Sequence, residues 1–279
     1  MRPSQVQKTP ARKRVLTRNA SAIILAIAIG VLLFCVAISN AYKIGSLAAA
    51  NGDYGVARWA LRVAATIGNA NAQNNLAGLY AEGLGGERSD TLAANWYQRA
   101  ADQGVTQAKF NLSNFYEEGR GVPRDTRKAV ALLESAASDG DIDATFNLGH
   151  LYCTGRDDLP RDVETGIAWY RKAADRGFAP AQYNLGSLFA QGVGVQRDLA
   201  EAAKWFTQAA QQGHAKAQLD LGTMYALGLG LQRDIPQGFE WLHKAARKQP
   251  TSVTARERIE AICREVPSLE AALCKLWKQ

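Results

Sequence analysis

The residues most able to carry out chemistry are few in this sequence. It holds three histidines, His150, His214 and His243, and none belongs to a set of cysteines and histidines with the spacing of a zinc site. The motifs typical of P-loop nucleotide-binding proteins, zinc proteases and serine hydrolases are missing. The sequence therefore predicts a protein that is not an enzyme, has no cofactor or metal, and acts on no small-molecule substrate.

Asparagine offers a different chemistry, because its amide both donates and accepts hydrogen bonds. It recurs as Asn75, Asn111, Asn147 and Asn184, and Asp220 follows at the same interval. Such a ladder suits the backbone of an extended peptide ligand. The alternative is that these amides bond neighbouring parts of the protein itself, and the sequence leaves both interpretations open.

The interval belongs to a repeated unit. The stretch AQYNLGSLFAQGVGVQRD returns 36 residues later as AQLDLGTMYALGLGLQRD, and units begin at Ala72, Ala108, Ala144, Ala181 and Ala217. A fixed period of this size is typical of stacked repeats. Each unit opens with alanine, leucine and an aromatic residue at helical spacing, so we expect a first helix that buries this stripe against its neighbours.

Signals for the end of one helix and the start of the next recur in every unit. Five glycines suit the left-handed conformation at the first helix's C-terminus: Gly83, Gly119, Gly155, Gly192 and Gly228. Five N-cap residues follow: Ser89, Asp125, Asp162, Asp198 and Asp234. Asp198 with Glu201, and Asp234 with Gln237, have the spacing of a capping box, in which each side chain bonds the other residue's backbone N–H.

The second helix of each unit carries a pair of large residues and then two alanines. Trp96-Tyr97 precedes Ala100-Ala101, and Trp169-Tyr170 precedes Ala173-Ala174. Large residues opposite small ones allow neighbouring helices to pack closely. We therefore expect both members of each large pair to lie in the core.

These motifs resemble the Sel-one-like repeat family, which is related to the tetratricopeptide repeat. The match covers about residues 72–252. The resemblance implies an all-α, right-handed superhelical α/α solenoid, which in this chain we expect to follow one transmembrane helix. It also implies a concave surface, lined by the first helices, that binds a protein or peptide.

The candidate binding residues occupy the fourth, seventh and eleventh positions of the first helices, which share one face of a helix. We call this set the polar stripe. It comprises Asn75, Glu82, Asn111, Asn114, Glu118, Asn147, His150, Asn184, Ser187, Gln191 and Asp220.

Charge is distributed unevenly along the 279 residues. Six basic residues and no acid precede the segment from Ala20 to Ser39, which carries no charge over its 20 residues. That length suits a membrane-spanning helix, and the basic flank places the N-terminus in the cytoplasm. The alternative is a cleaved signal peptide, although its apolar region is usually shorter. If the segment is an uncleaved anchor, the repeats lie in the periplasm, attached to a bacterial inner membrane.

The remainder of the chain carries 27 basic and 26 acidic side chains, so it has no basic surplus for nucleic acid. The predicted segments are a cytoplasmic tail (1–19), a signal-anchor helix (20–39), a degenerate repeat (40–71), five repeats (72–252) and C-terminal capping helices (253–279). Cys263 and Cys274 flank a turn at Pro267, and we expect a disulfide between them.

The predicted function is a membrane-tethered scaffold that binds a protein partner. Two alternatives stay open: an immunity protein that neutralises a secreted antibacterial effector, such as a type VI secretion lipase or nuclease, and a regulator of envelope assembly or signalling. The sequence does not separate these three.

Overall fold

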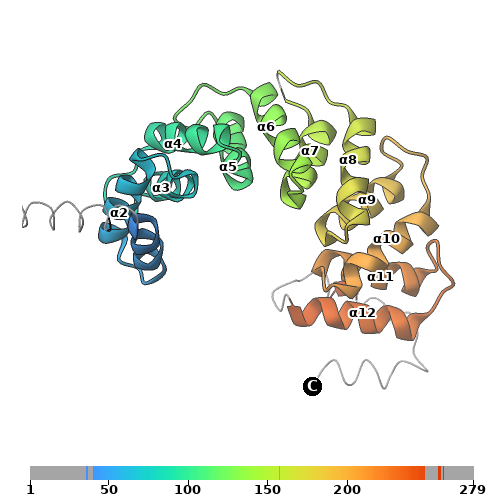
Figure 1. The fold of residues 1–279 in the computed structure, drawn as a ribbon. Coiled ribbons are helices and arrows are strands. Elements are labelled where there is room, and N and C mark those ends of the chain that lie inside the picture. Colours follow the sequence, from blue (N-terminus) through green and yellow to red (C-terminus); the bar gives the residue numbers. More distant parts are fainter. Residues whose placement is uncertain (1–35, 37–39, 157, 249–256, 259, 261–279) are drawn as a thin grey trace, which may run out of the picture. The chain divides into compact units, whose positions relative to one another are not determined.

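The computed structural model describes residues 36, 40–156, 158–248, 257–258 and 260. A helix over residues 40–50 is followed by further helices, and the only β pairing among the described residues is an isolated bridge between Arg156 and Leu159 (Figure 1). The helices are α2 (Tyr54–Thr66), α3 (Ala70–Glu82), α4 (Asp90–Asp102), α5 (Thr106–Glu118), α6 (Thr126–Ser138), α7 (Ile142–Thr154), α8 (Val163–Asp175), α9 (Ala179–Gln191), α10 (Leu199–Gln211), α11 (Ala215–Leu227) and α12 (Ile235–Lys248).

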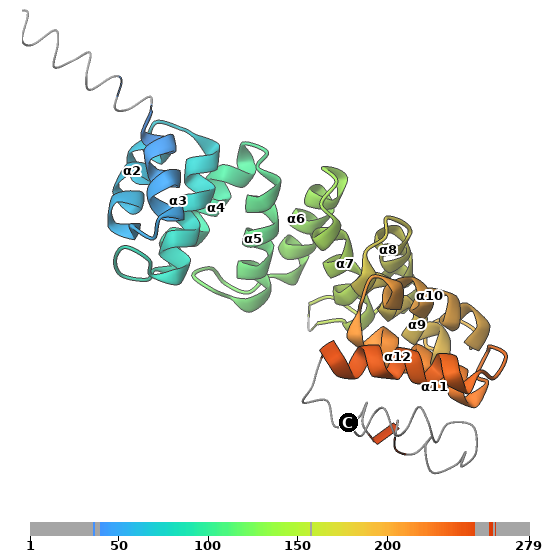
Figure 2. The same cartoon turned by 90° about the horizontal axis from the view of Figure 1, so that it is seen from below.

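The chain divides into two compact units. The first contains the described residues up to Ala108 together with 120–122, and the second contains 109–119 and the described residues from Pro123 onward. Within a unit, the two helices of a repeat pack together, and each second helix packs against the next first helix, as α8 does against α9. Figure 2 shows this order in the second unit, where the α9–α10 pair lies next to the α11–α12 pair.

Four sequence predictions lie outside the described residues. These are the cytoplasmic tail (1–19), the membrane span over 20–39 except for Val36, the C-terminal capping helices (253–279) except for residues 257–258 and 260, and the Cys263–Cys274 disulfide. Within the part of the chain that the structure describes, every helix is too short or too polar to cross a bilayer.

The predicted apolar stripe of the first helices forms the core. In α3, Ala72 and Leu76 are fully buried, and Leu79 and Tyr80 are nearly so. The position of Leu76 is also a leucine in α7, α9 and α11, and these residues, Leu148, Leu185 and Leu221, have no exposed surface. Because a buried leucine typically contributes about 2–5 kcal/mol, packing between repeats is the main source of stability.

The expectation that both large residues of the second helix lie in the core is wrong for the first residue of the pair. Tyr97, Tyr170 and Phe206 are buried, but the tryptophans before them are only half-buried. The indole rings carry cations on their outer faces: the Arg99 guanidinium lies 4.8 Å from the Trp96 ring, and Lys172 Nζ lies 3.8 Å from the Trp169 ring. The i, i+3 spacing of each pair brings cation and ring together on the helix surface.

The five predicted N-caps are confirmed. Ser89, Asp125, Asp162 and Asp198 each accept a hydrogen bond from the backbone N–H three residues on, and Asp234 does the same for Gln237. The reciprocal half of the capping box is wrong. The backbone N–H of Asp198 donates to the Phe189 carbonyl, while Glu201 pairs with Lys204, because the returning loop brings the preceding helix within reach.

The five helix-ending glycines also take positive φ angles as predicted, between 70° and 72°. Gly155 differs in ψ, which is 172° rather than the 23° to 36° of Gly83, Gly192 and Gly228. It opens the one loop that carries an extra residue, so the added length is accommodated directly after the helix.

A buried glutamine links consecutive repeats. Gln73 Nε2 donates to the Ala65 carbonyl at the end of α2, and its Oε1 accepts from Gln103 Nε2 at the end of α4. Gln182 bonds the Ala174 carbonyl and Gln212 in the same way. Because these amides are 3–4% exposed, losing either partner would leave a buried polar group unsatisfied.

A second link joins each loop to the preceding repeat. In four loops a glycine lies so close to the preceding second helix that no side chain would fit. A Cβ added there would overlap the first residue of that helix: Gly85 with α2, Gly121 with α4, Gly194 with α8 and Gly230 with α10. The longer loop makes the equivalent contact with a side chain instead: Asp158 Oδ2 accepts a 2.7 Å hydrogen bond from the N–H of Thr126, the first residue of α6. Every described interhelix loop from repeat one to repeat five thus contacts the start of the previous second helix.

This contact predicts a sharp difference between two glycine substitutions. Gly230→Ala combines a positive φ of 67° with overlap on the Leu199 backbone, so we expect it to lower the free energy of unfolding by about 3 kcal/mol or more. Gly177→Ala also has a positive φ, 84°, but its Cβ would meet nothing within 4 Å, and about 1 kcal/mol is expected. Urea denaturation followed by circular dichroism measures both. Equal losses would show that backbone conformation, not loop packing, sets the requirement for glycine.

Candidate functional site

The polar stripe lies at the surface of both units, as helical spacing requires. Asn75 and Glu82 belong to the first unit, and the remaining nine residues belong to the second. Five members are exposed: Asn75, Glu82, Glu118, His150 and Gln191. Six are half-buried: Asn111, Asn114, Asn147, Asn184, Ser187 and Asp220. The half-buried positions are accessible to a ligand and are also close to neighbouring helices.

Some members of the stripe have partners within the protein. Asn184 forms a hydrogen bond with the Tyr170 hydroxyl of the preceding repeat, Ser187 Oγ donates to the Tyr183 carbonyl, and Asn75 Oδ1 accepts from Asn74. Burial nevertheless raises the pKa of Tyr170 to about 12. The asparagine ladder is thus not uniform, and Asn184 contributes to contact between repeats.

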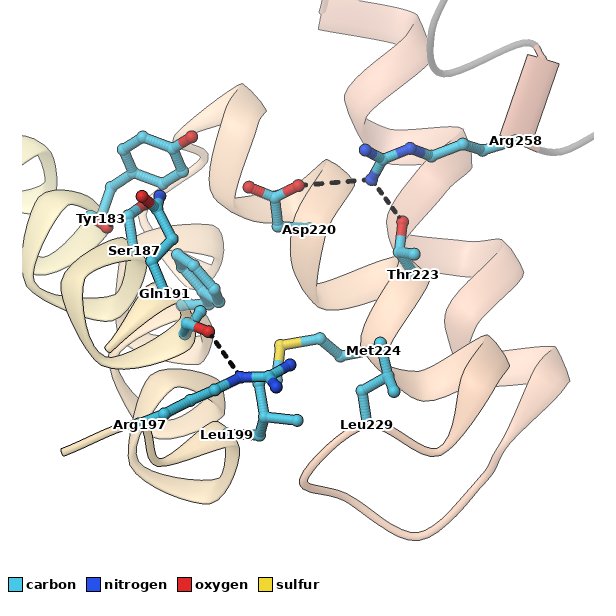
Figure 3. A pocket seen from close by; sticks show the side chains of 12 residues that line it. Tyr183, Ser187, Gln191, Arg197, Leu199, Asp220, Thr223, Met224, Leu229 and Arg258 are labelled. Atoms are coloured by element: carbon cyan, nitrogen blue, oxygen red, sulfur yellow. Dashed lines mark hydrogen bonds and ion pairs between the residues drawn. The ribbon is translucent and has the colours of Figure 1, made fainter. Parts of the chain in front are cut away.

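The structure brings three members of the stripe, Ser187, Gln191 and Asp220, together in a pocket of about 330 Å³ between α9 and α11 (Figure 3). Ser187 and Gln191 come from α9, and Asp220 and Thr223 come from α11. Apolar side chains also line it, namely Leu199, Phe206, Met224 and Leu229. An apolar pocket with a few polar groups is the usual form of a binding site.

A residue outside the repeats completes this pocket. Arg258 Nη1 lies 3.3 Å from Asp220 Oδ1 and donates to Thr223 Oγ1 over 2.6 Å (Figure 3). Sequence reasoning placed Asp220 in the stripe but missed Arg258, because the arginine lies 38 residues further along the chain. The contact shows that a guanidinium fits against the α11 part of the stripe.

Tyr183 lines the pocket and contacts a histidine beside it. Its ring stacks on His214 with centroids 4.7 Å apart, and burial, followed by the charge of Asp220, raises the pKa of its hydroxyl. His214 Nδ1 accepts a hydrogen bond from the Ala217 N–H, so the imidazole is the N-cap of α11. Burial and the nearby Lys216 lower the pKa of His214, which Asp220 opposes.

A recurring arginine was also missed by sequence reasoning. Arg161, Arg197 and Arg233 each precede a predicted N-cap, and their Nε atoms donate to carbonyls near the end of α7, α9 and α11. A cation at this end complements the helix dipole. The signal was present, since an arginine stands directly before the N-cap in every repeat.

The described residues include one cysteine, Cys153. Cys153 is half-buried, and desolvation raises the pKa of its thiol, which disfavours the nucleophilic thiolate. A Cβ at Gly166 would overlap its sulfur, so Cys153 packs between α7 and α8. No cluster of three or more histidine, cysteine, aspartate or glutamate side chains that could hold a metal occurs within the described ranges.

The helices, loops and stripe define an all-α repeat solenoid. A family model described as Sel1 repeat matches residues 70–105, 106–141, 142–178, 179–214 and 215–250, and the chain belongs to this family. Sel1 repeats generally mediate protein binding.

Several solved structures are similar to this chain. A Sel1 repeat protein from Oxalobacter formigenes is 30% identical with a TM-score of 0.67, and the match covers 80% of this chain and 88% of that one. Pseudomonas aeruginosa pilF is 19% identical with a TM-score of 0.57, over 79% of this chain and 96% of that one. An immunity protein from the same organism is 25% identical with a TM-score of 0.42, over 75% and 74%. No curated protein matches the sequence.

The His214 cap predicts a dependence of stability on pH. Only the neutral imidazole accepts the Ala217 N–H, and the lowered pKa means that the folded protein binds this proton less readily than the unfolded chain. The stabilisation of the folded protein by the neutral His214 cap is therefore complete above pH 6.5, the ordinary histidine pKa, and is lost as the pH falls. We expect His214→Asn to reduce the loss of stability between pH 7 and pH 5.

Asparagine is the matched replacement because Asn69 caps α3 at the same position. Denaturation midpoints at both pH values provide the measurement, and His150→Asn, which removes an exposed histidine without touching a cap, is the control. The same pH dependence in His214→Asn as in the unchanged protein would contradict the prediction.

Proposed function

We propose that this Sel1 repeat protein is a non-enzymatic scaffold tethered to the bacterial inner membrane, which binds a protein or peptide in the periplasm. The observation that carries the proposal is the α9–α11 pocket, where polar stripe residues from two consecutive repeats lie beside apolar side chains. A ligand that bridges two repeats would gain both hydrogen bonds and apolar contact. Repetition of the stripe on α5 and α7 extends the same chemistry to earlier repeats of the second unit.

The Arg258 contact suggests what such a ligand presents to the pocket. Asp220 and Thr223 already bind one guanidinium, and Asn147 offers an amide on α7 that makes no side-chain hydrogen bond to another described residue. A basic side chain of the partner would displace Arg258 from Asp220 and Thr223. The backbone of the partner would form hydrogen bonds with the side-chain amides of the polar stripe, such as that of Asn147. Charged hydrogen bonds are the stronger kind, so Asp220 should contribute most.

The periplasmic tether follows from the sequence of the first 39 residues. A segment of 20 uncharged residues has the length of a membrane-spanning helix, and all six charges before it are positive. Basic residues beside such a segment are retained in the cytoplasm, so the repeats on its other side would be exported.

The binding proposal is tested by capture of partners from bacterial envelopes with the full-length protein. The double variant Asn147→Ala with Asp220→Asn removes one amide and one charge, so we expect at least a tenfold loss of captured partner. Asp175→Asn, a matched charge change at the exposed end of α8, should capture as much as the unchanged protein. Helical content, followed by circular dichroism, should be equal in all three. Undiminished capture by the folded double variant would exclude the pocket.

The identity of a captured protein then separates the remaining roles. A secreted antibacterial effector would make this chain an immunity protein. An envelope-assembly or signalling protein would make it a regulator.

The tether is tested by reporter fusions to the full chain. Alkaline phosphatase fused after Gln279 should be active in intact bacteria, because that enzyme folds only outside the cytoplasm, while a cytoplasmic reporter at the same position should be inactive. The opposite pattern would contradict the proposal. An N-terminus that begins at Asn40 or Tyr42 in the mature protein would replace the anchor by a cleaved signal peptide.

A further inference from the structure

Exposed large apolar side chains gather at one end of the described chain. Seven of the ten that the described residues contain lie within positions 36–67, namely Val36, Ile44, Leu47, Tyr54, Val56, Trp59 and Ile67. Trp59 and Leu47 are each 65% exposed. Single exposed apolar residues are common in soluble proteins, but a concentration of them marks an interaction surface.

On α2 these residues form one face that departs from the pattern of the repeat. Val56, Trp59, Val63 and Ile67 recur at helical spacing, and we call them the outer face of α2. The position of Trp59, six residues after the N-cap, is exposed in every later second helix and is small or polar there: Asn95, Ala131, Ala168, Lys204 and Glu240. The position of Ile67 is likewise exposed and polar in the later repeats: Gln103, Asp139, Arg176 and Gln212.

The opposite face of α2 is already buried in the array. Ala57, Ala60, Leu61, Ala64 and Ala65 are at most 1% exposed. The helix is therefore apolar on both sides, a composition that is typical of helices covered on both sides. In the first unit only one of these sides is covered by the described residues.

The place of α2 in the chain indicates what covers the other side. The uncharged segment ends at Ser39, directly before the described helical residues 40–50. That helix and α2 form a close antiparallel pair, because only residues 51–53 connect them and a Cβ at Gly45 would overlap Leu61. The C-terminal end of α2, which includes Ile67, consequently lies beside residue 40, the residue that directly follows the uncharged segment.

Charge near this surface suits an anionic lipid. Between residues 40 and 69 the chain carries a single acid, Asp53, and two exposed basic residues, Lys43 and Arg62. A third basic residue, Arg58, lies over the Tyr80 ring and donates to the Glu87 carbonyl, so it stays within the repeat. Basic residues near a bilayer surface are attracted to anionic headgroups, and tryptophan favours the boundary between headgroups and acyl chains. Arg62 follows Trp59 by three residues, a spacing that brings the two side chains together on the surface of α2.

We propose that the outer face of α2 lies against the anionic phospholipid surface of the membrane that holds the anchor. The inference rests on the proposed tether and adds a second attachment to it. Together the span and α2 would hold the first repeat at the bilayer surface, because the span keeps the chain in the membrane and an apolar helix face gains free energy when it is buried at the interface.

Lipid quenching of tryptophan fluorescence tests this contact in the full chain. The protein is reconstituted in vesicles of phosphatidylethanolamine and phosphatidylglycerol whose acyl chains carry bromine close to the headgroup. Bromine should lower the emission of the unchanged protein, and Trp59→Phe should remove at least half of that decrease. Trp96→Phe is the matched control, because it removes the half-buried tryptophan of the next second helix, α4, and should keep the decrease.

Each other outcome has a distinct meaning. Equal quenching of Trp59→Phe and the unchanged protein, with both floating with the vesicles, overturns the lipid contact and leaves the tether intact. A full chain that does not float with vesicles overturns the tether and the lipid contact together. If Trp59→Asn instead converts a dimer in detergent to a monomer and bromine has no effect, a second copy covers the face and the proposal is wrong.

Discussion

No repeat in this protein can bury its own apolar stripe, and this constraint determines the rest of the structure. Leu76 and Leu148 reach zero exposure only because helices on both sides of them contribute apolar surface. Once two repeats are held together in this way, polar groups at the junction are buried as well. The amide of Gln73 or Gln182 satisfies those groups by bonding the preceding repeat and the end of its own repeat at once.

The fold was predictable from the sequence because its signals are local and recur. The glycine that ends each first helix and the N-cap that begins each second helix depend on backbone geometry over a few residues. The repeated alanine and leucine positions defined the core for the same reason. Trp96 and Trp169 were misplaced because composition alone cannot tell a buried ring from one whose outer face carries a cation.

The candidate site was less predictable, since its geometry depends on residues far apart in the chain. The fourth-position asparagines look alike in the sequence, yet Asn184 bonds Tyr170 and Asn147 does not share that contact. Arg258 reaches the stripe from beyond the last repeat, and no local pattern connects it with Asp220. The failed capping box at Asp198 has a similar origin, because a neighbouring helix supplied the acceptor that the motif expects from Glu201.

The loop of the third repeat shows that loop length and cohesion between repeats are separable. In the other loops a glycine contacts the start of the preceding second helix directly. In the loop of the third repeat, the Asp158 side chain makes this contact by accepting a hydrogen bond from the Thr126 N–H. A carboxylate at the positive end of α6 also has a lowered pKa, which keeps it charged in mildly acidic surroundings. Insertions should therefore be tolerated between the helices of any repeat that gains an acid in register, and such loops are natural points for grafting new sequence.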